Sequence, residues 1–186
     1  MCDNTHSIAE VREAALDDVK VIQDLHHALC RYEYENGFNP DIDLQGSYSP
    51  RFAEYVCSRI CERTGAAFIV SVEGIVAGYF LGAVSENSKG KRARLGSLFV
   101  HPQQRRKGIG QCLVSEFLSW VQGVGAVAVT VAAAPGNTAT VNLYRALGFR
   151  GQILDLGGAL EDFVGEDARD SNNAIHFIWI VRWVLV

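Results

Sequence analysis

Residues 100–110 read VHPQQRRKGIG, so that three consecutive cations precede a Gly-x-Gly. The chain around them is acidic, with 17 Lys and Arg against 21 Asp and Glu and a formal net charge of −4. A β-rich run ends at Val100, and apolar residues return with helical spacing from Gly108. The stretch is therefore predicted to be the turn between a strand and a helix.

Such a turn is suited to hold an anion. Several backbone amides near 105–110 would point outward, unpaired, at the positive end of the helix dipole. Glycines at 108 and 110 lack the Cβ atoms that would keep an anion off the backbone. Arg105, Arg106 and Lys107 add positive charge. The turn predicts a phosphate or pyrophosphate site, and a solvated turn with exposed cations is the alternative that these residues alone leave open.

The turn does not match two common phosphate-binding motifs, and the charge of the chain argues against a third kind of phosphate-bearing partner. A dinucleotide fingerprint needs a third glycine where this chain has Leu113. A Walker loop places its lysine after the glycines, whereas Lys107 precedes Gly108. The acidic net charge and the lack of an extended basic face argue against nucleic acid as a partner.

Bulk properties predict a single cytoplasmic domain over residues 1–186. The chain is 48% hydrophobic and has no low-complexity segment. Its five cysteines are odd in number and lack paired metal spacing, so buried thiols in a reducing compartment, and no metal, are expected. The N-terminus lacks the pattern of a signal peptide. The longest apolar run, residues 174–186, is too short to span a bilayer, so no membrane partner is expected.

Local patterns predict the element order β-α-α-β-β-β-α-β-α-β-β. Strands are expected at 8–14, 66–72, 75–84, 89–100, 126–133, 151–156 and 174–186, and helices after Asp17 or Asp18, from Ser49-Pro50, at 108–123 and at 137–149. Glu73-Gly74 signals a hairpin. The continuous apolar run 126–133 is typical of a strand covered on both faces.

Two segments of this pattern resemble a known family. Arg105-x-x-Gly108-x-Gly110 resembles the acyl-CoA signature R/Q-x-x-G-x-G/A of the GNAT superfamily of N-acetyltransferases. The family's "N…LY…LGF" segment is matched, beginning 27 residues after Gly110, by Asn137, Leu143, Tyr144, Leu147, Gly148 and Phe149. The two signatures occur at the right separation and in a matching element order, which is more specific than either alone.

The resemblance implies a mixed, mostly antiparallel sheet of six to seven strands flanked by about four helices, and acetyl-CoA as cosubstrate. In the family, the fourth and fifth strands separate and the pantetheine arm lies between them. The residues that would contact the cofactor are Leu98, Phe99, Val100, Arg105, Arg106, Lys107, Gly108, Ile109, Gly110 and Asn137. Asn137 either only caps its helix or also meets the cofactor. Tyr144 matches the family's general acid, which hydrogen-bonds or protonates the leaving thiolate.

The general base stays unassigned. The family often places a Glu or His on the fourth strand, where this chain has Arg94 and Gly96. Ser97, Glu33, Glu35 or an ordered water chain remain open. His176 is a weak candidate, because a hydrogen-bonded core histidine is the commoner case.

Charge gives the only indication of the acceptor. Residues 32–50 and 155–170, which flank the acceptor end of the cleft in the family, hold ten of the 21 acidic residues. They suggest a cationic amine, either a small molecule such as a polyamine or aminoglycoside or a basic peptide, although two solvated acidic loops explain the same bias.

The leading prediction is transfer of an acetyl group from acetyl-CoA to a primary amine by direct attack on the thioester. A catalytically idle acyl-CoA-binding sensor or scaffold is the main rival, and the absent strand-four base favours it. A hydrolase or nucleotide-binding protein that uses the same turn is a third possibility. A homodimer is possible because the family is often dimeric.

Overall fold

A computed structural model describes residues 9–134 and 136–151 of this chain. The strands are β1 (Ala9–Glu13), β2 (Gly65–Val72), β3 (Ile75–Asn87), β4 (Gly90–Val100) and β5 (Ala128–Val131), and the helices are α1 (Val19–Glu35), α2 (Pro50–Cys61), α3 (Ile109–Gly123) and α4 (Thr138–Ala146). This order confirms the predicted one through α4.

The strands form one mixed sheet in the order β1-β2-β3-β4-β5. The first three pairings are antiparallel, and β4 and β5 run parallel, as the crossover through α3 requires. The sheet of the described residues has five strands rather than six to seven. The two remaining strands, predicted at 151–156 and 174–186, lie outside the described residues except for Gly151, and the single domain over 1–186 stays a prediction.

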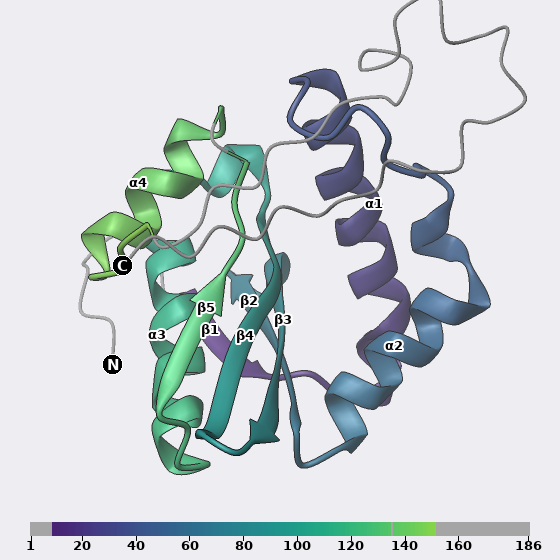
Figure 1. Ribbon diagram of the computed structural model, residues 1–186. Coiled ribbons are helices and arrows are strands. Elements are labelled where there is room, and N and C mark those ends of the chain that lie inside the picture. The colour runs from purple at the N-terminus through teal and green to yellow at the C-terminus, as the bar shows by residue number, and fades with distance from the viewer. Residues whose placement is uncertain (1–8, 135, 152–186) are drawn as a thin grey trace, which may run out of the picture. The chain divides into compact units, whose positions relative to one another are not determined.

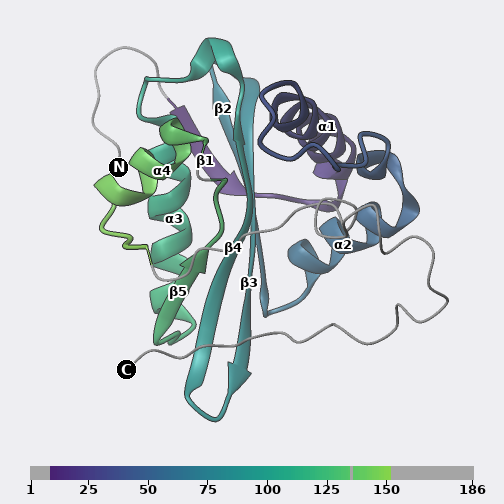
Figure 2. The same ribbon diagram turned by 45° about the horizontal axis from the view of Figure 1, so that its top comes forward.

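Helices cover both faces of the sheet (Figures 1 and 2). On one face, α1 and α2 pack through Ile22, Leu25 and Val56 on the β-strands. On the other, α3 packs through Leu113 and Phe117, both 0% exposed. Two hydrophobic cores therefore hold the sheet between them, with Leu95 of β4 in the core under α3 and Phe99 in the core under α1 and α2.

Three local sequence signals form the helix cap, the hairpin turn and the helix end that their residue types favour. Ser49 caps α2 by accepting a hydrogen bond from the Phe52 amide (3.2 Å), with Pro50 in the first turn. Glu73 and Gly74 form the two-residue turn between β2 and β3. Gly148 follows α4 directly after its C-cap residue, Leu147.

Two burial expectations are wrong. The four residues of β5 are half-buried rather than covered on both faces, because β5 is the last strand of the described sheet. The cysteines are not all buried thiols. Cys30 is buried, but Cys57 is half-buried and Cys61, one turn further along α2, is exposed.

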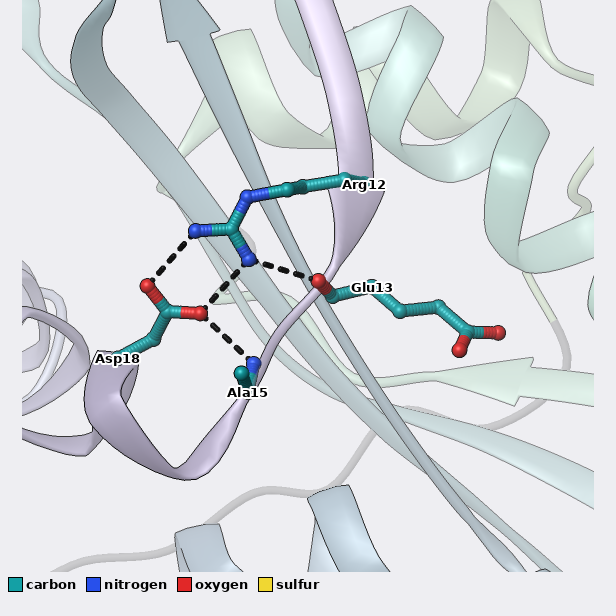
Figure 3. Close-up of polar contacts among 4 residues, drawn as sticks. All are labelled: Arg12, Glu13, Ala15 and Asp18. Carbon is teal, nitrogen blue, oxygen red and sulfur yellow. Dashed lines mark hydrogen bonds and ion pairs between the residues drawn. The ribbon is translucent and has the colours of Figure 1, made fainter.

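An ion pair fixes the connection from β1 to α1 (Figure 3). The two terminal nitrogens of the Arg12 guanidinium donate to the Asp18 carboxylate at 2.8 and 2.9 Å, and the Ala15 amide donates to the same group at 2.7 Å. The hydrogen bond from Arg12 lowers the pKa of Asp18, while burial opposes the shift. The carboxylate therefore stabilises the fold above its unfolded pKa of about 3.9, and this stabilisation is lost as the pH falls through the lower folded value.

Replacing Asp18 by asparagine is expected to lower the free energy of unfolding by about 1–2 kcal/mol at pH 7, because the charged hydrogen bonds are lost. Urea denaturation at pH 7 measures it, and the difference should shrink toward pH 2. The matched control is Asp24→Asn, which breaks the exposed Lys20–Asp24 pair (2.8 Å) and should change stability little. Equal effects from both variants would contradict the role given to Asp18.

Candidate active site

The fourth and fifth strands separate where the resemblance predicts. They pair only over Arg92–Leu95 and Ala128–Val131. Beyond Leu95, residues 96–100 of β4 still pair with β3 on one side, apart from Gly96, but have no strand partner on the other among the described residues. Their backbone groups on that side can therefore pair with an extended ligand, as an added strand would.

A bulge at Gly96 changes which face the side chains of β4 reach. The register passes from Leu95 opposite Gly82 to Ser97 opposite Leu81, so Gly96 is the extra residue. If Gly96 were instead a regular member of the strand, alternation would place Ser97 on the same face as Leu95. Instead, Ser97 turns toward α1 and α2, while Leu98 joins Leu95 in the core under α3. The bulge thus brings a hydroxyl to the α1–α2 face at the point where the strands separate.

The turn before α3 has the geometry of an anion cradle. Gly108 is the N-cap residue and has a φ of +79°, and a Cβ built on it meets no atom within 4 Å. The first backbone hydrogen bond into the helix runs from the Cys112 amide to the Gly108 carbonyl (3.0 Å). Within the described residues, the amides of residues 106–111 donate to no backbone carbonyl. Buried Ile109 anchors the first helical turn, so these amides surround an open space at the positive end of α3.

The three cations of the turn differ in their surroundings. Arg106 and Lys107 are exposed, and Lys107 Nζ donates to Gln104 Oε1 at 2.8 Å. Arg105 is half-buried: its Nε donates to the Val100 carbonyl at 2.9 Å, and its guanidinium lies 4.3 Å from the centre of the Tyr32 ring on α1. Arg105 therefore also braces the turn against α1.

Four further cations are far from this turn. Lys89, Lys91 and Arg92 lie at the β3–β4 hairpin end of β4 and Arg94 near its middle, whereas the turn follows the other end of this 11-residue strand. At about 3.4 Å per residue, the strand separates its two ends by roughly 30 Å. Lys91 instead donates to the Val124 carbonyl at 3.0 Å. Residues 89–107 hold seven of the 17 Lys and Arg of the chain, but these seven do not form one basic site.

The two sequence signatures meet in space. A Cβ on Gly110 would lie 3.3 Å from Leu143 Cδ2, so the first turn of α3 packs directly on α4. Tyr144, the next residue, is 5% exposed and belongs to the same core cluster as Ile109. Its hydroxyl makes no hydrogen bond with the described part of the chain, and burial raises the pKa of Tyr144 well above its ordinary value. The phenol therefore stays protonated and can donate.

Asn137 caps α4, with its side chain accepting from the Thr140 amide at 3.2 Å. The capping role considered from the sequence is thus present. The structure places Asn137 in the loop between β5 and α4, and the next residue toward β5, Gly136, would contact Phe38 through a Cβ at 3.5 Å. The loop after α1 and the loop after β5 therefore meet on the side of the sheet where β4 and β5 diverge.

Of the four acidic residues at the end of α1 and in the loop after it, Glu33 is the least exposed. Burial raises the pKa of its carboxyl, and a hydrogen bond with Asn39 opposes this rise. Glu35, Asp41 and Asp43 are exposed. The second acidic stretch, 155–170, and His176 lie outside the described residues.

Sequence analysis left Ser97 open as a base but missed the two residues, Tyr79 and His26, with which it forms a polar cluster on the α1–α2 face. His26 of α1 places Nδ1 2.6 Å from the hydroxyl of Tyr79 on β3, and Ser97 hydrogen-bonds to the same hydroxyl. Tyr79 is 0% exposed, and His26 stacks on Phe52 at 4.1 Å. The only signal was a polar aromatic in each apolar pattern: Tyr79 within a buried strand, and His26 beside the core position Leu25.

A family model described as "Acetyltransferase (GNAT) family" matches residues 23–149, which span α1 to the end of α4. The chain belongs to the acetyltransferase (GNAT) family. It is therefore an acetyl-CoA-dependent N-acetyltransferase, and acetyl-CoA is its cosubstrate. No curated protein sequence matches it. Within residues 9–134 and 136–151, every helix is too short or too polar to span a lipid bilayer.

Solved structures share the fold of this GNAT protein. A GCN5-related N-acetyltransferase from Ralstonia eutropha JMP134 aligns with a TM-score of 0.66 at 18% identity, over 81% of this chain and 98% of that one. An aminoglycoside acetyltransferase from an uncultured soil metagenomic sample, in complex with sisomicin, has a TM-score of 0.62 at 18% identity, over 82% and 96%. An aminoglycoside N-acetyltransferase in complex with CoA has a TM-score of 0.62 at 16% identity, over 83% and 97%.

The residues present fit acetyl-CoA. The open space over Gly108 and the unpaired amides of 106–111 suit a diphosphate, and Arg106 and Lys107 lie exposed beside them. The unpaired edge of residues 96–100 suits an extended amide-containing arm. Both features lie at the same end of β4.

Proposed function

We propose that this GNAT protein acetylates a primary amine by direct attack on the thioester of acetyl-CoA, and that the acceptor is a cationic small molecule or a basic peptide. The observation that carries the proposal is the separation of β4 from β5 beside the glycine turn of α3. This arrangement gives a diphosphate and a pantetheine arm separate sites on one edge. The amine would approach from the side of α1 and α2, where the polar side chains gather.

We assign the cofactor contacts as follows. The amides of Lys107, Gly108, Ile109 and Gly110 hold the diphosphate, with Arg106 and Lys107 adding charge. Arg105 positions the turn against Tyr32. The backbone groups of Leu98, Phe99 and Val100 pair with the arm and polarise the thioester carbonyl. Asn137 caps α4 and so supports the helix that carries Tyr144.

Acetyl-CoA supplies an activated acetyl group whose leaving group is a thiol with a pKa of about 8.5. The acceptor nitrogen must be neutral to attack, so a proton has to leave the ammonium first. Tyr144 donates its hydroxyl hydrogen to the departing sulfur. The raised pKa of this phenol favours hydrogen bonding over complete transfer, so Tyr144 stabilises the thiolate where it forms.

The cationic acceptor rests on charge and position. Glu33 carries a half-buried carboxylate at the end of α1, and Glu35, Asp41 and Asp43 extend the negative field outward. A neighbour of the same fold was solved with sisomicin, which is consistent with a cationic small molecule as acceptor. Opposite charge in a cleft raises the local concentration of a ligand and weakens with salt.

We expect spermidine to be acetylated faster than neutral amines of similar size, with an advantage that falls as salt rises. Replacing Glu33 by glutamine should raise the KM for spermidine several-fold and leave that of a neutral amine unchanged. The matched control is Glu86→Gln, which removes a charge at the β3–β4 hairpin, beyond a Debye length from the cleft. Release of free CoA thiol measures all rates. Equal rates without salt dependence would remove the cationic acceptor from the proposal.

A further inference from the structure

Three polar side chains from three elements meet beside the bulge of β4. The Tyr79 hydroxyl lies 2.6 Å from His26 Nδ1 and is also hydrogen-bonded by Ser97. Phe99 pairs with Tyr79 and Ser97 pairs with Leu81, so Ser97 and Tyr79 lie on the same face as diagonal neighbours across the two strands. Ser97 is half-buried and Tyr79 is fully buried. The row formed by Ser97, Tyr79 and His26 therefore leads from the diverging strands into the protein.

The hydrogen bonds give this row a direction. His26 is neutral near pH 7, because burial, together with the neighbouring His27, lowers the pKa of His26 to about 4. A hydrogen bond from Ser97 to the Tyr79 oxygen leaves the phenol hydrogen for His26 Nδ1. His26 then carries its own hydrogen on Nε2. Ser97 therefore donates to Tyr79, and Tyr79 donates to His26.

We propose that Ser97, Tyr79 and His26 form a path that carries the proton of the acceptor ammonium away from the reacting nitrogen. The proposal rests on the amine acetylation proposed above. The ammonium gives a proton to Ser97 Oγ, Ser97 gives its hydroxyl hydrogen to Tyr79, and Tyr79 gives its own to His26 Nδ1. His26 releases its Nε2 hydrogen to water. One proton enters and one leaves, and the nitrogen regains its lone pair for attack.

The row supplies a route for the proton that a strand-four base would otherwise accept. This chain has Arg94 and Gly96 at the positions where the family often places that base. Ser97 would touch the acceptor, whereas Tyr79 and His26 act through it. No member has to hold a full charge for long, which suits a site where burial disfavours ions. The titratable groups around the row are His27, Cys30 and Glu33 of α1 and Tyr55 of α2. The Tyr55 hydroxyl lies over the bulge, 3.0 Å from a Cβ built on Gly96.

The kinetic test compares pH profiles of kcat/KM for a simple amine such as spermidine. Tyr79→Phe keeps the buried ring and removes the hydroxyl, and His26→Gln removes the final acceptor. Without the path, only amine that is already neutral reacts. Since an amine with a pKa of about 10.4 is neutral in only a few molecules per ten thousand at pH 7, we expect each variant to lose at least about a hundredfold there. Its kcat/KM should then gain about tenfold per pH unit and approach the wild type only near pH 10, with the KM for acetyl-CoA unchanged.

The control is His27→Gln, because His27 is the adjacent histidine and its Nδ1 bonds the Leu44 carbonyl instead (2.8 Å). It should keep the wild-type profile. A second readout does not depend on turnover: nitrogen NMR of His26 should show the hydrogen on Nε2 at pH 7. If Tyr79→Phe does not fold, His26→Gln and the NMR measurement decide.

The outcomes separate the two proposals. A wild-type enzyme that releases no CoA thiol with any amine overturns both. Turnover in which the variants lose activity equally at every pH, or lose none, overturns the path alone and leaves the acetylation standing. A hydrogen on Nδ1 of His26 also overturns the path, because Tyr79 could then not donate to that nitrogen.

Discussion

Replacing Gly108 by alanine is expected to weaken acetyl-CoA binding about a hundredfold while the protein stays folded. The new Cβ would meet no protein atom, so it would occupy the space proposed for the diphosphate. Losing two hydrogen bonds between backbone amides and a charged phosphate costs about 3 kcal/mol, which is close to a hundredfold in Kd. Isothermal titration with acetyl-CoA measures the change directly.

Gly125 offers a matched control at the other end of α3. It has a φ of +71°, and a Cβ built on it also meets nothing within 4 Å. Alanine at either position therefore carries the same cost of a left-handed conformation, about 1–2 kcal/mol. Gly125→Ala should lower the melting temperature as much as Gly108→Ala and leave the affinity unchanged. Equal affinities in both variants would exclude the turn as the diphosphate site.

Replacing Tyr144 by phenylalanine is expected to lower kcat on the order of a hundredfold, with the KM for acetyl-CoA nearly unchanged. The phenyl ring keeps its packing against Phe149, whose ring centre lies 5.5 Å away, so the fold should be preserved. Only the hydrogen bond to the departing sulfur is lost. Since burial keeps the hydroxyl protonated, the wild-type rate should show no alkaline loss from this group below pH 10.

Steady-state kinetics and thermal unfolding of Tyr144→Phe together distinguish catalysis from packing. A fall in kcat without a fall in melting temperature supports the role of hydrogen-bond donor. A fall in melting temperature with an unchanged kcat would make Tyr144 a core aromatic that the family motif merely happens to include.

Much of the fold could be predicted because its signals are local. The capping residue Ser49, the turn at Glu73-Gly74 and the apolar spacing of α3 each act within a few residues, and each formed as expected. The glycine turn was recognisable for the same reason. Gly108 has the positive φ and the open surroundings that an anion cradle requires.

The remaining features depend on residues far apart in the chain. The bulge at Gly96 is set by the pairing of β4 with β3, and alternation along β4 alone does not reveal it. His26 and Tyr79 are 53 residues apart and meet only because α1 packs on β3. Conversely, Lys89 and Lys91 are close in sequence to Arg105, but an extended strand carries them away from it. Distance along the chain therefore fails in both directions. The lysines are closer to Arg105 in sequence than in space, and His26 and Tyr79 are closer in space than in sequence.

The extra residue in β4 makes its two halves separately adjustable. Up to Leu95, the inward side chains belong to the core under α3, and from Ser97 onward the pleat is offset by one position. An engineer could therefore exchange Ser97, which faces α1 and α2, to admit a different acceptor without repacking the core under α3, to which Leu95 and Leu98 belong. Deleting Gly96 would make Leu95 and Ser97 adjacent, opposite Gly82 and Leu81, so a regular ladder would remove the bulge and still leave the Ser97 hydroxyl on the α1–α2 face.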